Sequence, residues 1–447
     1  MDMLTTGPRP VQATDRIETL DLLRGVAICG ILLMNIPYMG MVGDLGMPAF
    51  PAMWNADWIA WGIQSVLFEG TMRGLFTMLF GAGMLLMLRR AEGEAPDVSP
   101  VDVWARRCWA LILLGIIQFV LFLWPGEILV NYGVTGLFLL AVRTVKPRAL
   151  IAGAAAILIV MSCFYIHQRV ERTQMLQAST AAAAAKAANK KLTEEQEGAL
   201  EAREKAIEIY HPKPADTARQ IKERTHFPSI LTWSLGQWND WNMGGSEWYL
   251  LICESIAFMM IGMALFRTGI LTGNGSAATY RWMMLIGYGG GFAGRLVALY
   301  WGSRTGFDLD FDKLSVSYTV FRNAMYEPTR LAITIGHVGL LATLFRSGAL
   351  GRAKPLRALG RMALTVYSLQ SIITSVLFYA LGWVGSFGFA TLMAIAVSIW
   401  VITGAFAMWW LDRFDMGPAE RFLRAMSYGS LSMLRPKPVT ASIAPIS

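Results

Sequence analysis

Long apolar runs recur along the whole chain and are separated by mostly short polar connections. A helix needs roughly 20 apolar residues to cross a bilayer, and about ten segments meet that criterion. The predicted spans are residues 20–38, 72–88, 104–123, 128–142, 150–167, 248–266, 282–300, 331–345, 363–381 and 389–410. An amphipathic stretch at 57–68 is typical of an interfacial helix. The pattern predicts an all-α, polytopic membrane protein.

Lys and Arg gather in alternate connections. They follow the second, fourth, sixth and eighth spans and recur in the C-terminal tail, whereas the connections after the third and ninth spans have none. Cytoplasmic loops carry an excess of Lys and Arg, so both termini are predicted to be cytoplasmic. The same rule accounts for the net charge of +8, and no nucleic-acid partner is expected.

Composition agrees with this class, because 55% of the residues are hydrophobic, only 16% are charged and the mean hydropathy is +0.44. The four cysteines lie in apolar runs without a CxxC pair, so neither a disulfide framework nor a metal site is expected. Asp21 and Arg24 interrupt the first apolar run, which is therefore expected to remain as an anchor and not to be cleaved.

One polar segment divides the chain into predicted parts. Residues 1–168 hold five spans, 169–246 form a helical loop on the outer side, 247–427 hold five more spans, and 428–447 form a cytoplasmic tail. Within the loop, Thr193 and Gln196 form a predicted capping box. The loop is either a solvated helical hairpin or a cover that selects a substrate for an outward-facing site.

Three polar residues of the first span are candidates for function, since ionisable groups at membrane depth are costly. Asp21 and Arg24 are three residues apart and predict either a structural ion pair or an anion-binding Arg at the cytoplasmic end. Asn35 lies roughly 16 Å further along the helix. Its amide would either hydrogen-bond a neighbouring helix or stabilise a reacting carbonyl.

A second candidate cluster opens the next span. Glu69 and Arg73 are four residues apart at its outer end, where they would form a surface pair, or Glu69 would act as a general base. Gly74, Gly81 and Gly83 would allow another helix or a ligand to approach closely.

Further candidates lie in later spans. Arg361 begins the ninth span, and Tyr367 and Gln370 share one face of it, where they would line a polar cavity. His337 is either a hydrogen-bonded structural residue or a group for proton transfer. Glu254, in the sixth predicted span, is a further candidate for function on the same grounds.

These residues carry a family resemblance. The stretches RIETLDLLRGVAICGILLMNI, GTMRGLFTMLFGAG, LGRMALTVYSLQSI and FDMGPAERFLRAMSYG resemble the YeiB-like family of bacterial membrane proteins, a domain of unknown function. That family is similar to transmembrane acyltransferases of the heparan-glucosaminide N-acetyltransferase type. The resemblance implies acetyl transfer from acetyl-CoA, with Asp21, Arg24, Gly25 and Asn35 matching the opening pattern. The outer segment after Asn35 holds no His to match the one that assists transfer in that group.

The resulting hypothesis is a multi-pass acyltransferase of the bacterial inner (plasma) membrane. Cytoplasmic acyl-CoA would bind through Asp21, Arg24, Arg73, Arg361, Tyr367 and Gln370, with Asn35, Glu69 and His337 as catalytic residues. The expected partners are membrane lipids and a small-molecule, glycan or lipid acceptor at the outer face. The oligomeric state stays open, a homo-oligomer included. The alternatives are a transporter or exporter of a small metabolite, lipid or antibiotic, and a sensor within an envelope complex.

Overall fold

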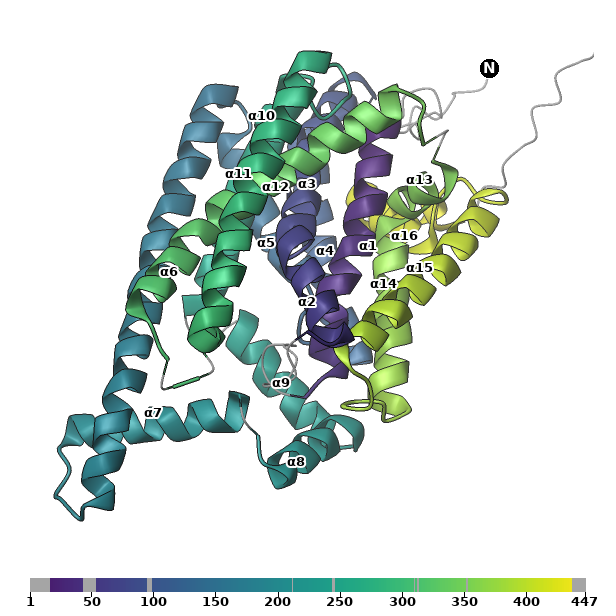
Figure 1. Cartoon of the computed structure of the whole chain (residues 1–447). Helices are drawn as coiled ribbons and strands as arrows, with labels where there is room; N and C mark the ends of the chain where they lie inside the picture. The colour runs from purple at the N-terminus through teal and green to yellow at the C-terminus, as the bar shows by residue number, and fades with distance from the viewer. Residues whose placement is uncertain are drawn as a thin grey trace, which may run out of the picture.

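The computed structural model describes residues 17–42, 54–94, 99–210, 212–242, 246–308, 310–311, 313–350 and 353–435. All regular structure in these ranges is helical (Figure 1). Nine helical segments within them are long and apolar enough to cross a membrane, namely Glu18–Gly40, Ala56–Arg89, Pro100–Phe122, Pro147–Ala187, Trp248–Arg267, Ala277–Thr305, Val316–Arg346, Ala363–Ala380 and Phe389–Leu411. The prediction of an all-α polytopic membrane protein is confirmed.

The two ends of the helix bundle differ in what they carry. The start of α1 (Glu18–Gly40) lies at one end with α13 (Lys354–Arg361) and α16 (Pro418–Tyr428), as Figure 1 shows. Helices α7 (Glu194–Tyr210), α8 (Pro214–Thr225) and α9 (Ser229–Asn242) lie at the opposite end. We call these the inner end and the outer end. The charge pattern predicts that the inner end faces the cytoplasm.

Helix α1 (Glu18–Gly40) forms the centre of the bundle. Most of it is buried, and it packs against α3 (Thr71–Glu94), α13, α14 (Ala363–Ser375) and α15 (Phe389–Leu411). By contrast, α11 (Ala277–Thr305) packs on α12 (Val316–Arg346) and exposes large apolar side chains such as Trp282 and Ile286. Exposed apolar residues on a peripheral helix are what contact with lipid requires.

The fourth predicted span, 128–142, is present but is shorter than a standard transmembrane helix. Helix α4 (Pro100–Phe122) is followed by α5 (Leu129–Phe138) and a 3-10 turn, Leu139–Val142. Fourteen helical residues cover about 20 Å, less than the hydrocarbon thickness. Gly133 lets this short helix lie directly on α4, since a Cβ at that position would lie 2.6 Å from the Cys108 carbonyl oxygen. The short crossing is thus enclosed by the bundle.

Glycine also brings α3 and α10 (Ser246–Arg267) together. A Cβ on Gly81 would lie 2.2 Å from the Met259 carbonyl oxygen, and one on Gly262 would lie 1.9 Å from that of Met78. Gly81 therefore permits the close helix approach that the sequence predicted, whereas Gly83 meets nothing within 4 Å.

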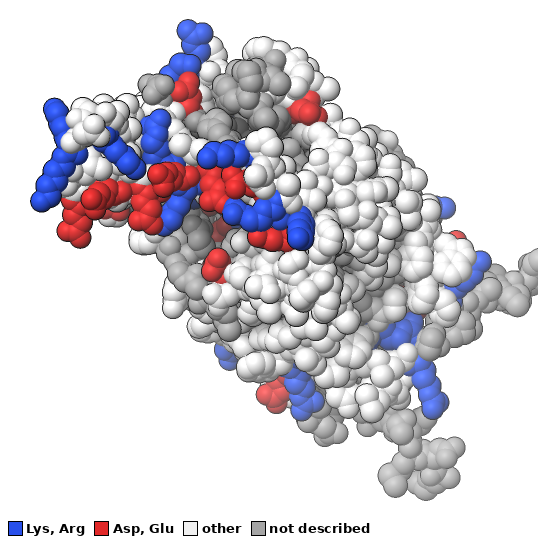
Figure 2. Space-filling view, turned by 90° about the horizontal axis from the view of Figure 1, so that it is seen from below, with Lys and Arg blue, Asp and Glu red and all other residues white. Residues whose placement is uncertain are grey.

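The outer segment is built on α6 (Pro147–Ala187), a single helix of 41 residues. The predicted boundary at residue 168 falls inside this helix, which continues without a break. The predicted capping box at the start of α7 is confirmed, because Thr193 and Gln196 exchange hydrogen bonds of 3.1 and 3.2 Å. In the view of the outer face, charged side chains gather in one band (Figure 2).

Arg224 of α8 ties the outer segment to α1. Its guanidinium group donates hydrogen bonds of 2.6–2.7 Å to the carbonyl oxygens of Tyr38, Met39 and Met41. The group also stacks on Trp233, 4.7 Å from the ring centre. A cation at the carbonyl end of a helix satisfies unpaired acceptors and complements the helix dipole. This buried side chain fixes α8 against the outer end of α1.

Candidate functional site

A cavity of about 530 Å³ lies between the outer halves of α1, α3, α6, α10, α11 and α12, beside α2 (Ala56–Leu67). We call it the outer chamber. Its volume suits a small ligand, since ligand pockets typically measure roughly 300–1,000 Å³. The charged residues that line it are Glu69, Arg73, Arg169, Arg172, Glu254, Arg295, Arg322 and Glu327.

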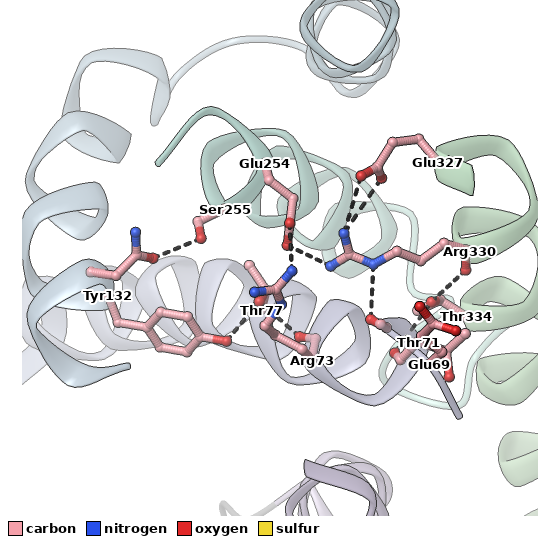
Figure 3. Close-up of polar contacts among 12 residues, drawn as sticks. Glu69, Thr71, Arg73, Thr77, Tyr132, Glu254, Ser255, Glu327, Arg330 and Thr334 are labelled. Atoms are coloured by element: carbon pink, nitrogen blue, oxygen red, sulfur yellow. Dashed lines mark hydrogen bonds and ion pairs between the residues drawn. The ribbon is translucent and has the colours of Figure 1, made fainter. Parts of the chain in front are cut away.

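A network of ion pairs forms the inner wall of the outer chamber (Figure 3). Glu254 accepts a hydrogen bond of 2.6 Å from Arg73 and one of 2.5 Å from Arg330. Arg330 also lies 3.3 Å from Glu327 and 4.5 Å from the centre of the Phe258 ring. Because opposite charges surround it, the fully buried Arg330 guanidinium is compensated at membrane depth.

Gly70 allows this network to reach the corner between α2 and α3. Its backbone has φ of +69°, and its carbonyl oxygen accepts a hydrogen bond of 2.9 Å from Nε of Arg330. A Cβ there would lie 2.7 Å from the same nitrogen. Glycine is required both for the left-handed backbone and for the space.

Hydroxyl and amide contacts extend the polar region deeper into the bundle. Thr77 on α3 lies 2.6 Å from the hydroxyl of Tyr132 on α5. One residue earlier on α5, the Asn131 amide oxygen accepts a hydrogen bond of 2.7 Å from Ser255, the neighbour of Glu254 (Figure 3). Polar contacts thus run from the outer chamber toward the short crossing of α5.

Glu69 has a different environment from the other two chamber carboxylates. Within the described part of the chain its carboxylate forms no ion pair, and it is half-buried. Its backbone carbonyl accepts a hydrogen bond of 2.7 Å from Arg295, which also binds two carbonyl oxygens at the end of α2. The predicted pairing of Glu69 with Arg73 is wrong, because the Arg73 guanidinium group forms an ion pair with Glu254 instead.

The other predicted catalytic residues lie outside the lining of the outer chamber. Met34, Pro37 and Tyr38 of α1 line it, but Asn35 does not. His337 lies between helices, with Nδ1 2.9 Å from the Tyr288 hydroxyl and Nε2 3.2 Å from the Leu67 carbonyl oxygen. The interpretation of His337 as a hydrogen-bonded structural residue therefore fits its contacts.

At the inner end, two sequence motifs meet. Asp21 and Arg24 form the predicted pair at 3.1 Å, and the Arg24 side chain is 28% exposed. Gly25 lies against the backbone of α13 at Leu356 and Gly360. Helix α13 belongs to the region that carries the LGRMALTVYSLQSI motif, so segments more than 300 residues apart share this end of the bundle.

The C-terminal motif completes the inner end. Glu420 of α16 accepts hydrogen bonds from the backbone N–H groups of Leu364 and Thr365, which open α14. Burial raises the pKa of the Glu420 carboxyl group, and it outweighs these hydrogen bonds, which lower that pKa. Arg361 donates a 3.2 Å hydrogen bond to the Asp415 carbonyl oxygen. Arg361 is therefore held toward the loop that precedes α16.

Tyr367 and Gln370 are buried in the middle of α14. The Tyr367 hydroxyl accepts a hydrogen bond of 3.4 Å from the backbone N–H of Ile128. In the described residues, the Gln370 side-chain nitrogen has no hydrogen-bond partner, and neither has the side-chain oxygen of Gln118 on α4. Buried polar atoms usually have partners, so each marks a place where a ligand or water is needed.

Glu127 lies between α4 and α5, close to Tyr367. Burial raises the pKa of its carboxyl group to about 7, although the backbone N–H groups of Leu129 and Val130 donate hydrogen bonds to it. No cluster of three or more metal-ligating side chains occurs within the described ranges.

Several residues in and behind the chamber wall were missed by the sequence reasoning. Arg295 and Glu327 line the chamber from α11 and α12, and Arg169 lines it from α6, just beyond the predicted fifth span. Arg330 of α12 lies behind the wall. The available signal was the pair of charges at positions 327 and 330. Both positions precede the predicted eighth span, 331–345, but they lie within α12, which begins at Val316.

Comparisons with known proteins find similarity to proteins of unknown function. Residues 265–430 match a family model described as a protein of unknown function (DUF418). The chain is 29% identical to uncharacterized protein YeiB of Escherichia coli K12, over 92% of this chain and 96% of that protein. It is 26% identical to uncharacterized protein YxaH of Bacillus subtilis 168, over 94% of this chain and 96% of that protein. No solved structure matches.

Proposed function

We propose that this YeiB-like, multi-pass membrane protein is an acyltransferase of the bacterial inner membrane that acts on an acceptor in the outer chamber. The observation that carries the proposal is the Glu69 carboxylate. It lines a ligand-sized cavity without an ion-pair partner among the described residues, whereas Glu254 and Glu327 are bound by arginines. A carboxylate in this setting is suited to general-base catalysis.

The proposed reaction moves an acyl group from acyl-CoA to a hydroxyl or amine. Glu69 takes the proton of the acceptor as its oxygen or nitrogen attacks the thioester carbonyl carbon. The carbon–sulfur bond then breaks, and the leaving thiolate takes a proton from solvent to give CoA. Asn35 and His337 do not line the chamber, so they have no direct role in this scheme.

The donor is proposed to enter at the inner end. Arg24 gives one nitrogen to Asp21 and is partly exposed, which leaves donors for a phosphate group. The unpaired side-chain atoms of Gln118 and Gln370 are one acceptor and one donor at mid-depth. Each amide group of the pantetheine arm of CoA has an N–H donor and a carbonyl acceptor, so it needs one acceptor and one donor as partners. Helix α1 joins the two regions, since it carries Arg24 and also packs against α14.

The test uses purified protein in lipid nanodiscs with acyl-labelled CoA donors of increasing chain length and a bacterial membrane extract as the source of acceptors. Free CoA is measured by mass spectrometry, because a thiol reagent would also react with the exposed Cys163. We expect the Glu69→Gln variant to lower the rate about 100-fold or more. Glu201→Gln, an exposed carboxylate of α7, is the matched control. Full activity in Glu69→Gln would overturn the role of Glu69.

A transporter is the second candidate, and the inner wall of the chamber favours it. Arg73 is half-exposed to the cavity and bound to Glu254, so an incoming ligand could exchange with this ion pair. Such an exchange would open the wall toward the inner end. If no acyl donor yields a labelled product while proteoliposomes release an accumulated ligand, transport replaces acyl transfer as the function.

A further inference from the structure

We infer that the outer chamber binds an anionic ligand, whose negative group is of the phosphate or carboxylate type. This inference deepens the proposed function, because it assigns the chemical class of the acceptor. Only the reaction of the bound ligand rests on the proposed function; the binding itself does not. The described lining of the chamber contains five arginines and three glutamates, so its formal charge is positive.

The carboxylates of the inner wall are already neutralised. Glu254 is bound by both Arg73 and Arg330, and Glu327 lies next to Arg330. Arg330 itself does not line the cavity, but its charge lies directly behind these two glutamates. The inner wall therefore contributes no negative potential that would repel an anion.

The positive charge is concentrated on the outer half of α6 and on α12. Arg169 and Arg172 of α6 line the chamber together with Arg322 of α12. The Arg169 guanidinium group is half-buried and has no hydrogen-bond or ion-pair partner in the part of the chain that the structure describes. The N–H donors of such an arginine are available to an anionic ligand.

Arginine also sets the chemistry of the anion. Its planar guanidinium group presents two parallel N–H donors, which match the oxygens of a carboxylate or phosphate. The aromatic residues Trp61 and Phe307 line the same chamber, with ring centres 5.3 Å apart. They give the anionic ligand an apolar surface on which to pack. The ligand is thus an anion with an apolar or ring-shaped portion.

The position of Glu69 links this ligand to the proposed reaction. Glu69 lies just before α3, while Arg169 projects from α6 into the same cavity. An acceptor whose anionic group is held by Arg169 can present a hydroxyl or amine to Glu69. The anion would then fix the orientation of the reacting group.

The experiment measures binding without any acyl donor. Protein in a neutral detergent is titrated with three probes: dioctanoyl phosphatidic acid, uncharged dioctanoylglycerol and sn-glycerol 3-phosphate. We expect the phosphatidic acid or the glycerol phosphate to bind at least 10-fold more tightly than dioctanoylglycerol. Binding of the lipid alone identifies a lipid headgroup as the source of the anion, and binding of both identifies a phosphate group in general.

Two variants make the result specific to the chamber. Arg169→Gln should weaken binding of the anionic probe at least 10-fold, and the same change at Arg219, an exposed residue of α8, should leave it unchanged. Equal binding of the neutral lipid, or full binding in Arg169→Gln, would overturn the inference. Acyl transfer to a neutral acceptor would leave the proposed function intact, and anion binding without transfer would leave this inference intact.

Discussion

Gly25 and Gly360 lie against each other where α1 crosses α13 at the inner end. A Cβ on Gly25 would lie 1.8 Å from the Leu356 carbonyl oxygen, and a Cβ on Gly360 would lie 1.8 Å from that of Asp21. Backbone meets backbone at both positions, so no side-chain movement can make room. This contact explains physically why each of the two distant motifs contains a glycine at this position.

Replacing either glycine should destabilise the fold. We expect Gly25→Ala or Gly360→Ala to cost about 3 kcal/mol, because overpacking a rigid contact typically costs about 1–3 kcal/mol. The control is Gly83→Ala on α3, where an added methyl group meets nothing within 4 Å. Melting temperatures in detergent should fall for the first two variants only. A fall of equal size in Gly83→Ala would contradict the explanation.

The ion-pair network behind the chamber should behave as one unit. Glu254→Gln leaves the buried Arg330 guanidinium undercompensated, and loss of one partner of a buried pair costs about 3–5 kcal/mol. The triple change of Glu254→Leu, Glu327→Leu and Arg330→Met removes the buried charges together and should cost less than Glu254→Gln alone. Thermal unfolding of the purified variants measures this order. If the triple variant melts lowest, the charges stabilise the fold more than their burial costs.

Arg224 should hold the outer segment in place. Arg224→Ala removes three hydrogen bonds to the end of α1 and leaves those carbonyl groups unpaired. We expect faster hydrogen exchange in α8 and in the last turn of α1, with the spans unaffected. Arg224→Lys should not restore protection, because an ammonium group cannot reach three carbonyl oxygens from one plane. Arg219→Ala on the same helix is the control, and equal exchange in both variants would refute the tether.

Glu127 should make stability depend on pH. Its pKa is raised by burial to about 7 in the folded protein, against about 4.3 in an unfolded chain, so the folded state binds an additional proton between these values. The contribution to stability is present below about pH 4.3 and is lost as the pH rises through 7. It amounts to about 4 kcal/mol at most. Melting temperatures from pH 5 to 8 should therefore fall more in the wild type than in Glu127→Gln. Parallel curves would show that Glu127 is not responsible.

The sequence predicted the helices well, because the length and polarity of a span are properties of its own residues. The resemblance of four motifs to YeiB-like proteins is confirmed by matches along nearly the whole chain. The predicted interfacial helix at 57–68 is present as α2, with Asn55 capping its N-terminus. The short α5 departs from the standard span because glycines and neighbouring helices, which no local pattern reports, enclose it.

The candidate site was predicted only in part, since helix contacts decide which charges meet. Arg73 was expected beside Glu69, but its partner is Glu254, which is 181 residues away in the chain. Asn35 and Met34 differ by a single position on α1, and the helix turn between them decides that only Met34 lines the chamber. Spacing along one helix shows which residues share a face, but it does not show which neighbouring helix or cavity that face contacts.

Helix α6 has a mechanical consequence. Its 41 residues extend about 60 Å, roughly twice the hydrocarbon thickness of a bilayer. The half within the predicted span and the half beyond it form one stiff rod, which carries the chamber arginines near its midpoint and packs on α7 beyond them. A small change in the tilt of this rod displaces α7 and the arginines together. A change in bilayer thickness that altered this tilt would therefore move the chamber arginines together with α7.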